Sequence, residues 1–520
     1  MLLQFSERAA IRDRFFQIGR RICQSPKLAW SLIGVGVLLR VSQYLANRSL
    51  WLDEVRLALN IVNRPFLELL QPLDYAQGAP IGFLMLAKLA VVAFGDNEYA
   101  LRLIPLWFGL LALPLFYAVA KRCLQPKAVP IALGLFAISD SLIYYSSEVK
   151  QYTGDVVMAL LISLLAIISL DRKWLTMPWI ALMGVAGGTA LWFSHPAVFV
   201  LAGAGMISII FCLGNNDKEK LGRLAIAFLL WAASFVVSYF AILRHLSQHT
   251  VLLNYWEGGF MPFPPSSLPD VKWFIHKFFE IFENPVGLSL SGVAAMALLI
   301  GCRALWEKSK PQLMILVAPI FFVLIASGLH KYPFSGRMLL FAVPAAMLLI
   351  GAGAGKIIEA AGREKIIGIA LVGLLFFHPL WSASYALVKP RTNEEIRPVM
   401  SYLQEHRQSG DVLYLYHNAA HPFQYYAPHY GFDRNDGIIG VNSRHNWKNS
   451  FDDLDKLQGN KRVWILFSHV YNWDHVDEEK LFVFHLDQIG TRLDAYASAG
   501  AAVYLYDLSL KDAVLSTRLE

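Results

Sequence analysis

The sequence SLWLDEVRLALN, which occupies Ser49–Asn60, directly follows the first long apolar segment of the chain. It places two adjacent acids, Asp53 and Glu54, at the edge of a hydrophobic span, where a charged group is costly and usually serves a function. Across Trp51–Phe66 apolar residues recur with the period of a helix, and Asp53 lies on the polar side near the helix start. The pattern predicts an amphipathic helix that lies in the membrane interface and carries two acids.

The composition is that of a protein dissolved largely in lipid. Of 520 residues, 56% are hydrophobic and only 16% are charged, too few charges to cover a soluble protein of this length. The net charge of +7 is typical of basic cytoplasmic loops, so we expect no nucleic-acid partner. The four cysteines show no paired spacing and no histidine cluster, so we expect free thiols rather than a zinc site or a redox motif.

The N-terminal part of the chain indicates the topology. Basic residues precede the apolar run Leu28–Ala46, which has spanning length and no small-residue cleavage site, so we expect a retained first span with a cytoplasmic N-terminus. Pro80–Gly95 is short for a span and carries Lys88, and we interpret it as a juxtamembrane helix. With this choice every basic connector falls on the cytoplasmic side, as the positive-inside rule requires.

The resulting membrane domain covers residues 1–390 and has about eleven transmembrane helices. Its first extracytoplasmic loop, residues 49–97, follows the first span and contains the juxtamembrane helices. After the first span, helices are expected near Glu98–Ala120, Val129–Tyr145, Tyr152–Leu170, Pro178–Phe193, Pro196–Leu213, Leu224–Leu243, Val286–Leu305, Pro311–Leu329, Met338–Gly355 and Ile366–Tyr385. The chain is therefore predicted to be a polytopic α-helical membrane protein with additional juxtamembrane helices.

A different texture begins at residue 391 and continues to residue 520, where charged and turn-forming segments replace the apolar runs. Strand and helix candidates alternate there, which predicts a small soluble α/β domain with a mostly parallel sheet. The predicted strands are Val412–Tyr416, Gly437–Val441, Val463–Phe467 and Ala502–Tyr506, and the predicted helices are Glu394–Arg407, Ala419–Tyr426 and Glu478–Ser498. The number of spans places this C-terminal domain outside the cytoplasm.

The predicted outer connectors contain polar groups that a purely structural membrane protein would not need. A carboxylate within hydrogen-bond reach can take the proton of an attacking hydroxyl, and cations can hold an anionic phosphate as it leaves. This inventory suits transfer of a sugar from a lipid-linked phosphate, with inversion at the anomeric carbon. Besides the catalytic candidates Asp53 and Glu54, the substrate-binding candidates are Glu148, Lys150, Tyr152, Asp155, His195, Lys331 and Arg337.

Several short motifs, in their order and spacing, resemble GT-C glycosyltransferases of the protein mannosyltransferase and aminoarabinose transferase type, most clearly over residues 28–200. They are Leu52-Asp53-Glu54, Ala79-Pro80, Glu98–Leu103, the tyrosine-rich connector Tyr144–Tyr152 and the segment that begins Ser335-Gly336-Arg337. The resemblance implies a GT-C fold, a polyprenyl-phosphate sugar as donor, Asp53 as catalytic base with Glu54 as its neighbour, and Arg337 at the donor phosphate. Members like the aminoarabinose transferases have a lysine before the juxtamembrane proline pair, where this chain has Gln77–Pro80.

Most of the candidate residues also have a purely structural explanation. The structural roles are a helix cap for Asp53, a dipole-complementing acid for Glu54, a salt bridge of Glu148 or Asp155 with Lys150, a bond to helix-end carbonyls for His195 and an interfacial anchor for Arg337.

We predict an inverting glycosyltransferase of a bacterial-type inner membrane, with a polyprenyl-phosphate sugar donor and a glycan, lipid or protein acceptor on the extracytoplasmic side. A divalent metal ion is left open as a cofactor, because two acids near a phosphate can hold one although their spacing does not demand it. The alternatives are a transporter or a flippase for lipid-linked sugars, and a non-catalytic scaffold. A transporter is disfavoured because the chain shows no repeated halves with interrupted helices.

Overall fold

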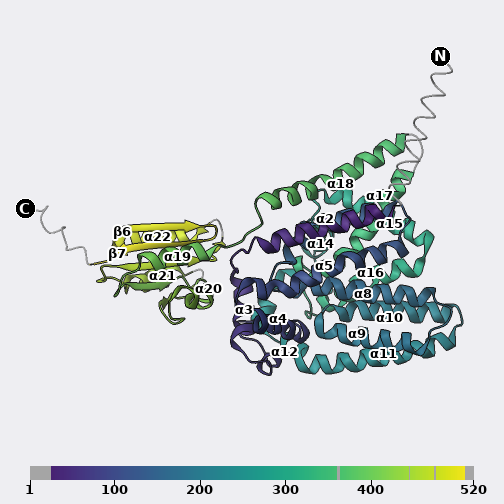
Figure 1. Cartoon of the computed structure of the whole chain (residues 1–520), viewed down its shortest axis with the longest axis horizontal. Coiled ribbons are helices and arrows are strands. Elements are labelled where there is room, and N and C mark those ends of the chain that lie inside the picture. The colour runs from purple at the N-terminus through teal and green to yellow at the C-terminus, as the bar shows by residue number, and fades with distance from the viewer. Residues whose placement is uncertain (1–24, 360–362, 444–445, 474–475, 510–520) are drawn as a thin grey trace, which may run out of the picture. The chain divides into compact units, whose positions relative to one another are not determined.

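The computed structural model describes residues 25–359, 363–443, 446–473 and 476–509 (Figure 1). Contacts divide the chain into two units. The first, here called the helical unit, consists of Met1–Ala46 and Arg64–Pro390, and the second, the α/β unit, consists of Asn47–Asn63 and Arg391–Glu520. The segment that carries Asp53 therefore belongs, by its contacts, with the C-terminal part of the chain.

Long apolar helices make up most of the helical unit. In the described residues, eight helices are long and apolar enough to cross a membrane, and the predicted polytopic α-helical membrane protein is confirmed. They are α2 (Pro26–Leu45), α5 (Glu98–Cys123), α8 (Tyr152–Asp171), α10 (Ala197–Gly214), α11 (Lys218–Ser238) with its extension to Leu246, α16 (Lys310–Gly328), the segment Gly336–Glu359 and the segment Ile366–Val388 of α18 (Arg363–Val388).

The other helices of this unit are shorter or less apolar. They are α4 (Ile81–Phe94), α6 (Ala128–Ile138), α7 (Asp140–Tyr145), α9 (Met177–Phe193), α12 (Arg244–Leu246), α13 (Thr250–Tyr255), α14 (Leu268–Glu283) and α15 (Ser291–Lys308), with the short turns η1 (Glu68–Leu70), η3 (Glu257–Gly259) and η4 (Gly336–Ala342), the last leading into α17 (Val343–Glu359).

The ends of α5 show how side chains define a span in this unit. At its start, Oδ1 of Asn97 accepts the backbone N–H of Ala100 at 2.9 Å, which satisfies one of the unpaired donors of a helix N-terminus. At its end, Nζ of Lys308 donates to the carbonyl oxygens of Arg122, Cys123 and Leu124 at 3.0–3.1 Å. A cation at a helix C-terminus also complements the helix dipole.

The sequence predicted one continuous helix over Val129–Tyr145, and this prediction is wrong. The helix is interrupted at Ser139, which separates α6 from α7. Arg40 of α2 explains the break, because its fully buried guanidinium donates to the carbonyl oxygens of Phe136 at 3.3 Å and Ala137 at 3.0 Å. In a continuing helix those carbonyls would accept from residues four positions later. The tertiary contact therefore replaces the hydrogen bonds that would have carried the helix forward.

The α/β unit contains a five-stranded sheet with strand order β2-β1-β3-β7-β6. β1 (Val412–Leu415) pairs in parallel with β2 (Ile438–Ile439) and β3 (Val463–Ser468), and β7 (Ala501–Asp507) pairs antiparallel with β3 and β6 (Thr491–Ser498). The predicted combination of helices and a small sheet in the C-terminal region is confirmed, but the sheet is mixed, so the expectation of a mostly parallel sheet is wrong. β3, buried along its whole length, is the central strand.

The expected helix Glu478–Ser498 is also wrong in its second half. Helix α22 (Glu478–Ile489) ends at Gly490, and β6 then forms a hairpin with β7. Gly500 lies in the hairpin turn with φ +67°, a left-handed conformation that glycine adopts without strain. The alanines of β6 favour helix by local propensity, and pairing with β7 overrides that preference.

Helices complete the α/β unit. They are α3 (Leu52–Asn63), α19 (Ile396–His406), α20 (Ala420–Tyr426), α21 (Trp447–Asp455) and α22, with the turn η5 (Ala427–Tyr430) and a separate pair of short strands, β4 (Asn472–Trp473) and β5 (Val476–Asp477). The predicted amphipathic helix after the first span is thus present as α3. It packs against α20.

Candidate active site

The first turn of α3 carries both acids of the opening motif, at the helix end where the dipole favours negative charge. Glu54 is fully buried, and its Oε2 lies 2.8 Å from Nη1 of Arg48, which is 1% exposed. The same oxygen accepts the backbone N–H of Trp51 at 3.4 Å. Asp53 is half-buried. Of the two acids, Glu54 is committed to a buried ion pair, whereas Asp53 is half-buried and its Oδ2 atom is enclosed.

Arg337, which lies in η4 of the helical unit, is held between two aromatic rings. Its guanidinium carbon is 5.8 Å from the ring centroid of Tyr152, the first residue of α8, and 5.7 Å from that of Trp256, just before η3. Cation–π attraction at these distances orients a guanidinium without neutralising its charge. The structure therefore brings Arg337 and Tyr152 together, and it adds Trp256, which sequence reasoning missed.

Tyr332 lies in the loop before Arg337 and close to Tyr152 and Asp155 at the start of α8. Its buried hydroxyl donates to the carbonyl oxygen of Met338 at 2.8 Å. Burial raises the pKa of the Tyr332 phenol well above its ordinary value, and the nearby Asp155 and Tyr152 raise that pKa further. The phenol is therefore neutral at physiological pH. Asp155, 4% exposed, lies in the first turn of α8 and so belongs to the same group of side chains.

The connector between α7 and α8 contains Glu148 and Lys150, which are both buried. Nζ of Lys150 donates to Oε1 of Gln77 at 2.6 Å. This bond brings the ammonium group to the segment just before α4, the helix that the sequence predicts to be juxtamembrane. Lys331, in contrast, has an exposed side chain.

His195 lies in the connector between α9 and α10. Its Nε2 atom is buried and has no hydrogen-bond partner in the part of the chain that the structure describes. Burial lowers the pKa of His195 to about 4, so the imidazole is neutral at physiological pH. A neutral ring here can accept or donate a hydrogen bond, but it contributes no charge to a phosphate site.

We expect stability to fall as the pH drops from about 6.5 to about 4. The unfolded chain has a histidine of ordinary pKa, about 6.5, so in this interval the unfolded state binds one more proton than the folded state, and stability rises with pH. Thermal unfolding of the detergent-solubilised protein across this interval should show a shallower pH dependence in His195→Gln. Equal dependence in both proteins would contradict the burial of a neutral His195.

Within residues 25–359, 363–443, 446–473 and 476–509, no group of three or more His, Cys, Asp or Glu side chains is placed to hold a metal ion. The divalent ion considered from the sequence therefore has no ligand cluster among these residues. Cys123, Cys212 and Cys302 are free thiols, as expected. Cys23 lies outside the described residues.

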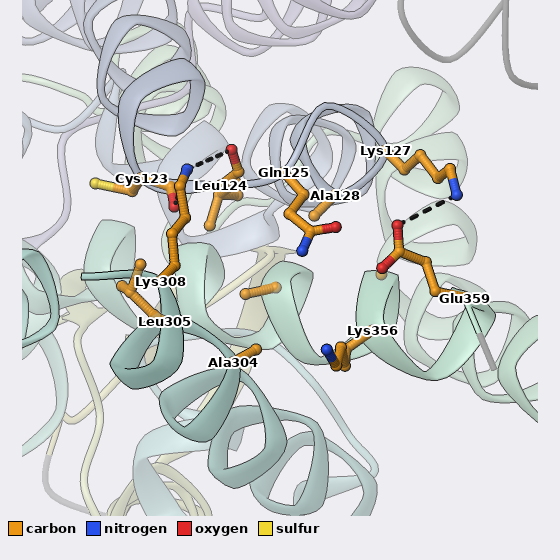
Figure 2. Close-up of a pocket in the computed structure, with 12 residues that line it drawn as sticks. Cys123, Leu124, Gln125, Lys127, Ala128, Ala304, Leu305, Lys308, Lys356 and Glu359 are labelled. Carbon is orange, nitrogen blue, oxygen red and sulfur yellow. Dashed lines mark hydrogen bonds and ion pairs between the residues drawn. The ribbon is translucent and has the colours of Figure 1, made fainter. Parts of the chain in front are cut away.

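A pocket lies at the other end of the span Gly336–Glu359 from Arg337, between the ends of α5, α15 and α17 and the start of α6. In Figure 2 Lys308 reaches the last turn of α5, and Lys127 pairs with Glu359 at 3.2 Å. The residues that line this pocket include none of the predicted site residues, so it is not the predicted site. The pocket does bring together Lys127, Lys308 and Lys356, which belong to three connectors predicted to be cytoplasmic.

The chain has the fold of the GT-C membrane glycosyltransferases. Its structure is similar to that of ArnT from Cupriavidus metallidurans in the apo state, with a TM-score of 0.52 and 12% identity over 92% of this chain and 98% of that chain. The same protein bound to undecaprenyl phosphate gives a TM-score of 0.51 and 11% identity over 91% and 97%. The implied GT-C fold is confirmed.

A third structure, the archaeal oligosaccharyltransferase AglB from Archaeoglobus fulgidus with an inhibitory peptide and a dolichol-phosphate, gives a TM-score of 0.48 and 12% identity over 92% of this chain and 74% of that chain. The sequence matches no protein-family model and no curated protein.

Proposed function

We propose that this protein is an inverting glycosyltransferase that moves a sugar from a polyprenyl-phosphate donor to an acceptor hydroxyl on the extracytoplasmic side of the membrane. The observation that carries the proposal is the difference between the two acids in the first turn of α3, where Glu54 is fully buried in an ion pair with Arg48 while Asp53 is only half-buried. A carboxylate held at a fixed helix start suits a general base. The ArnT structure with undecaprenyl phosphate, which shares the fold, supports a polyprenyl phosphate as the lipid carrier.

In the proposed reaction, a carboxylate oxygen of Asp53 takes the proton of the acceptor hydroxyl as its oxygen attacks the anomeric carbon. A new carbon–oxygen bond forms, and the bond between the anomeric carbon and the phosphate oxygen breaks. The electron pair of that bond leaves with the polyprenyl phosphate, and in-line displacement inverts the anomeric carbon. The protein needs no strong acid for this step, because the leaving group is already an anion.

We propose that two cations of the helical unit bind the phosphate as it leaves. The guanidinium carbon of Arg337 lies 5.8 Å and 5.7 Å from the ring centroids of Tyr152 and Trp256, and a guanidinium can form paired hydrogen bonds with a phosphate. The second cation is Lys150, whose ammonium reaches Gln77. The resemblance places a lysine on this juxtamembrane segment, and we propose that Lys150 supplies the equivalent charge from another connector.

For the topology we propose a cytoplasmic N-terminus and an extracytoplasmic C-terminal domain in an inner membrane. The pocket of Figure 2 supports this assignment, because it is lined by Lys127, Lys308 and Lys356, one from each of three basic connectors. These basic connectors thus gather at one end of the helical unit, the arrangement that the positive-inside rule gives for a cytoplasmic face.

Arg337→Ala is expected to raise the KM for a polyprenyl-phosphate sugar roughly ten- to a hundred-fold, because a charge-assisted hydrogen bond contributes about 1.5–3 kcal/mol. Arg337→Lys should retain part of the binding. The measurement is the initial rate of sugar release against donor concentration. Arg303→Ala is the matched control, since Arg303 is exposed at the pocket end of α15 and pairs with Glu307 in the same helix. Equal KM values for Arg337→Ala and Arg303→Ala would contradict the assignment.

The proposed function as a whole is tested by incubating purified protein with radiolabelled polyprenyl-phosphate sugars and comparing it with Asp53→Asn. Loss of transfer in the variant supports the proposal, and transfer that survives the substitution overturns the role of Asp53.

A further inference from the structure

Residues just before the first turn of α3 are hydrogen-bonded to acceptors that lie more than 340 positions later in the sequence. The backbone N–H of Ser49 donates to Glu395 at 3.2 Å, and the Ser49 hydroxyl donates to the same carboxylate at 2.8 Å. The N–H of Leu50 donates to the hydroxyl of Tyr426 at 2.8 Å, and the N–H of Leu52 donates to Glu394 at 3.2 Å. Side chains of the C-terminal domain thus accept from the first amide of α3, which a helix start leaves unpaired, and from two amides just before it.

These acceptors are themselves fixed. Glu394 is 4% exposed, also accepts from the hydroxyl of Ser468 at 3.4 Å and bonds to Nδ1 of His469. The ring of His469 packs on Trp51, with 6.0 Å between centroids. Tyr426 is 2% exposed on α20. A buried and already bonded carboxylate or phenol has few alternative rotamers, so it holds the amide that it accepts in one place.

Further contacts hold the same segment from both sides. Nε of Arg397 donates to the hydroxyl of Ser49 at 3.2 Å, and its guanidinium bonds to the carbonyl oxygen of Asn47. At the far end of α3, Nη1 of Arg434 donates to Oδ1 of Asn63 at 2.6 Å. Both ends of the helix that carries Asp53 are therefore attached to residues 391–520.

We propose that Glu394, Glu395 and Tyr426 are positioning residues for Asp53, and that the C-terminal domain serves catalysis by fixing the start of α3; this inference rests on the proposed function. Asp53 directly follows Leu52, whose amide Glu394 accepts, so movement of that amide displaces the carboxylate. General-base catalysis depends on such placement, since a misplacement of about 1 Å can reduce a rate roughly a hundred-fold. The geometry makes residues 391–520 part of the machinery that aligns the base.

The decisive variant is Tyr426→Phe, which removes one oxygen and keeps the ring. The peptide that contains Leu50 and Leu52 should exchange its amide hydrogens faster, and kcat with a radiolabelled undecaprenyl-phosphate sugar should fall about ten-fold. The KM for that donor should stay within two-fold of wild type, about the precision of such a comparison, because no donor contact is removed. Glu394→Ala should lower kcat further. Glu394→Gln should restore part of it, since the amide oxygen can still accept from Leu52.

Tyr402→Phe is the matched control. It makes the same substitution in the same domain, and its hydroxyl donates to Asp494 of β6 at 2.6 Å rather than to the segment before α3. We expect it to leave kcat and the amide exchange of residues 47–53 unchanged. If Tyr402→Phe loses as much stability as Tyr426→Phe but keeps its kcat, the lower kcat of Tyr426→Phe is due to lost positioning of Asp53 and not to general destabilisation.

Asp53→Asn is assayed in parallel, so that failure of the positioning role can be distinguished from failure of the proposed function. If Asp53→Asn is inactive while Tyr426→Phe and Glu394→Ala turn over at the rate of Tyr402→Phe, the positioning role is overturned and the proposed function stands. If exchange near Leu50 accelerates without any change in kcat, the positioning role is also overturned. If Asp53→Asn stays active, the base assignment and the inference fall together.

Discussion

Replacing Asp53 with asparagine is expected to reduce sugar transfer by roughly a hundred- to ten-thousand-fold, the usual contribution of a general base. The two side chains have nearly the same shape, so the first turn of α3 should keep its structure. Asparagine cannot take a proton from an acceptor hydroxyl at neutral pH. The measurement is the initial rate of transfer from a labelled polyprenyl-phosphate sugar, with thermal unfolding as the check that the variant is folded.

Asp74→Asn is the matched control for this experiment. Asp74 lies in the same predicted loop, its side chain is 60% exposed, and it pairs with Arg64 at 2.8 Å. We expect its activity to equal that of wild type. If Asp53→Asn and Asp74→Asn were equally active, Asp53 could not be the base, and the proton would have to go elsewhere.

The second large effect is expected at the buried ion pair between Arg48 and Glu54. Glu54→Gln leaves the Arg48 guanidinium buried without its carboxylate, and breaking a buried pair in this way typically costs about 3–5 kcal/mol. Both side chains are at most 1% exposed, so solvent cannot compensate. We expect a clear drop in thermal stability for Glu54→Gln and for Arg48→Met.

The double variant Arg48→Met/Glu54→Gln should recover part of the loss, because it contains no uncompensated buried charge. Glu307→Gln, which breaks the exposed pair with Arg303, should have little effect on unfolding. Single variants as stable as Glu307→Gln would show that the Arg48–Glu54 pair does not support the start of α3. A stable but inactive Glu54→Gln would instead favour a direct catalytic role for Glu54.

The sequence predicted those parts of the fold that depend on local pattern. Apolar runs of spanning length located most helices of the helical unit, and the 3.6-residue period located α3. Pattern failed where a distant contact decides the conformation. The break at Ser139 depends on Arg40, some hundred residues away, and β6 depends on its pairing with β7. Neither contact leaves a trace in the local order of residues.

The candidate site shows the same limit. The acid pair was found because charges at a membrane edge stand out in sequence, but the difference between a fully buried Glu54 and a half-buried Asp53 depends on Arg48 at the end of an apolar run. Trp256 was missed because one aromatic residue in a long loop resembles any interfacial tryptophan. A nearby signal existed in the adjacent Tyr255, since paired aromatics often mark a binding surface.

The most direct test of the central claim is to incubate the purified protein, in lipid vesicles with an envelope extract as acceptor source, with radiolabelled polyprenyl-phosphate sugars. The account predicts that label passes from the lipid to the acceptor fraction with release of an equal amount of polyprenyl phosphate, and that Asp53→Asn does neither. Recovery of every labelled donor intact, with label only redistributed between the two leaflets, would contradict a transferase and indicate a flippase.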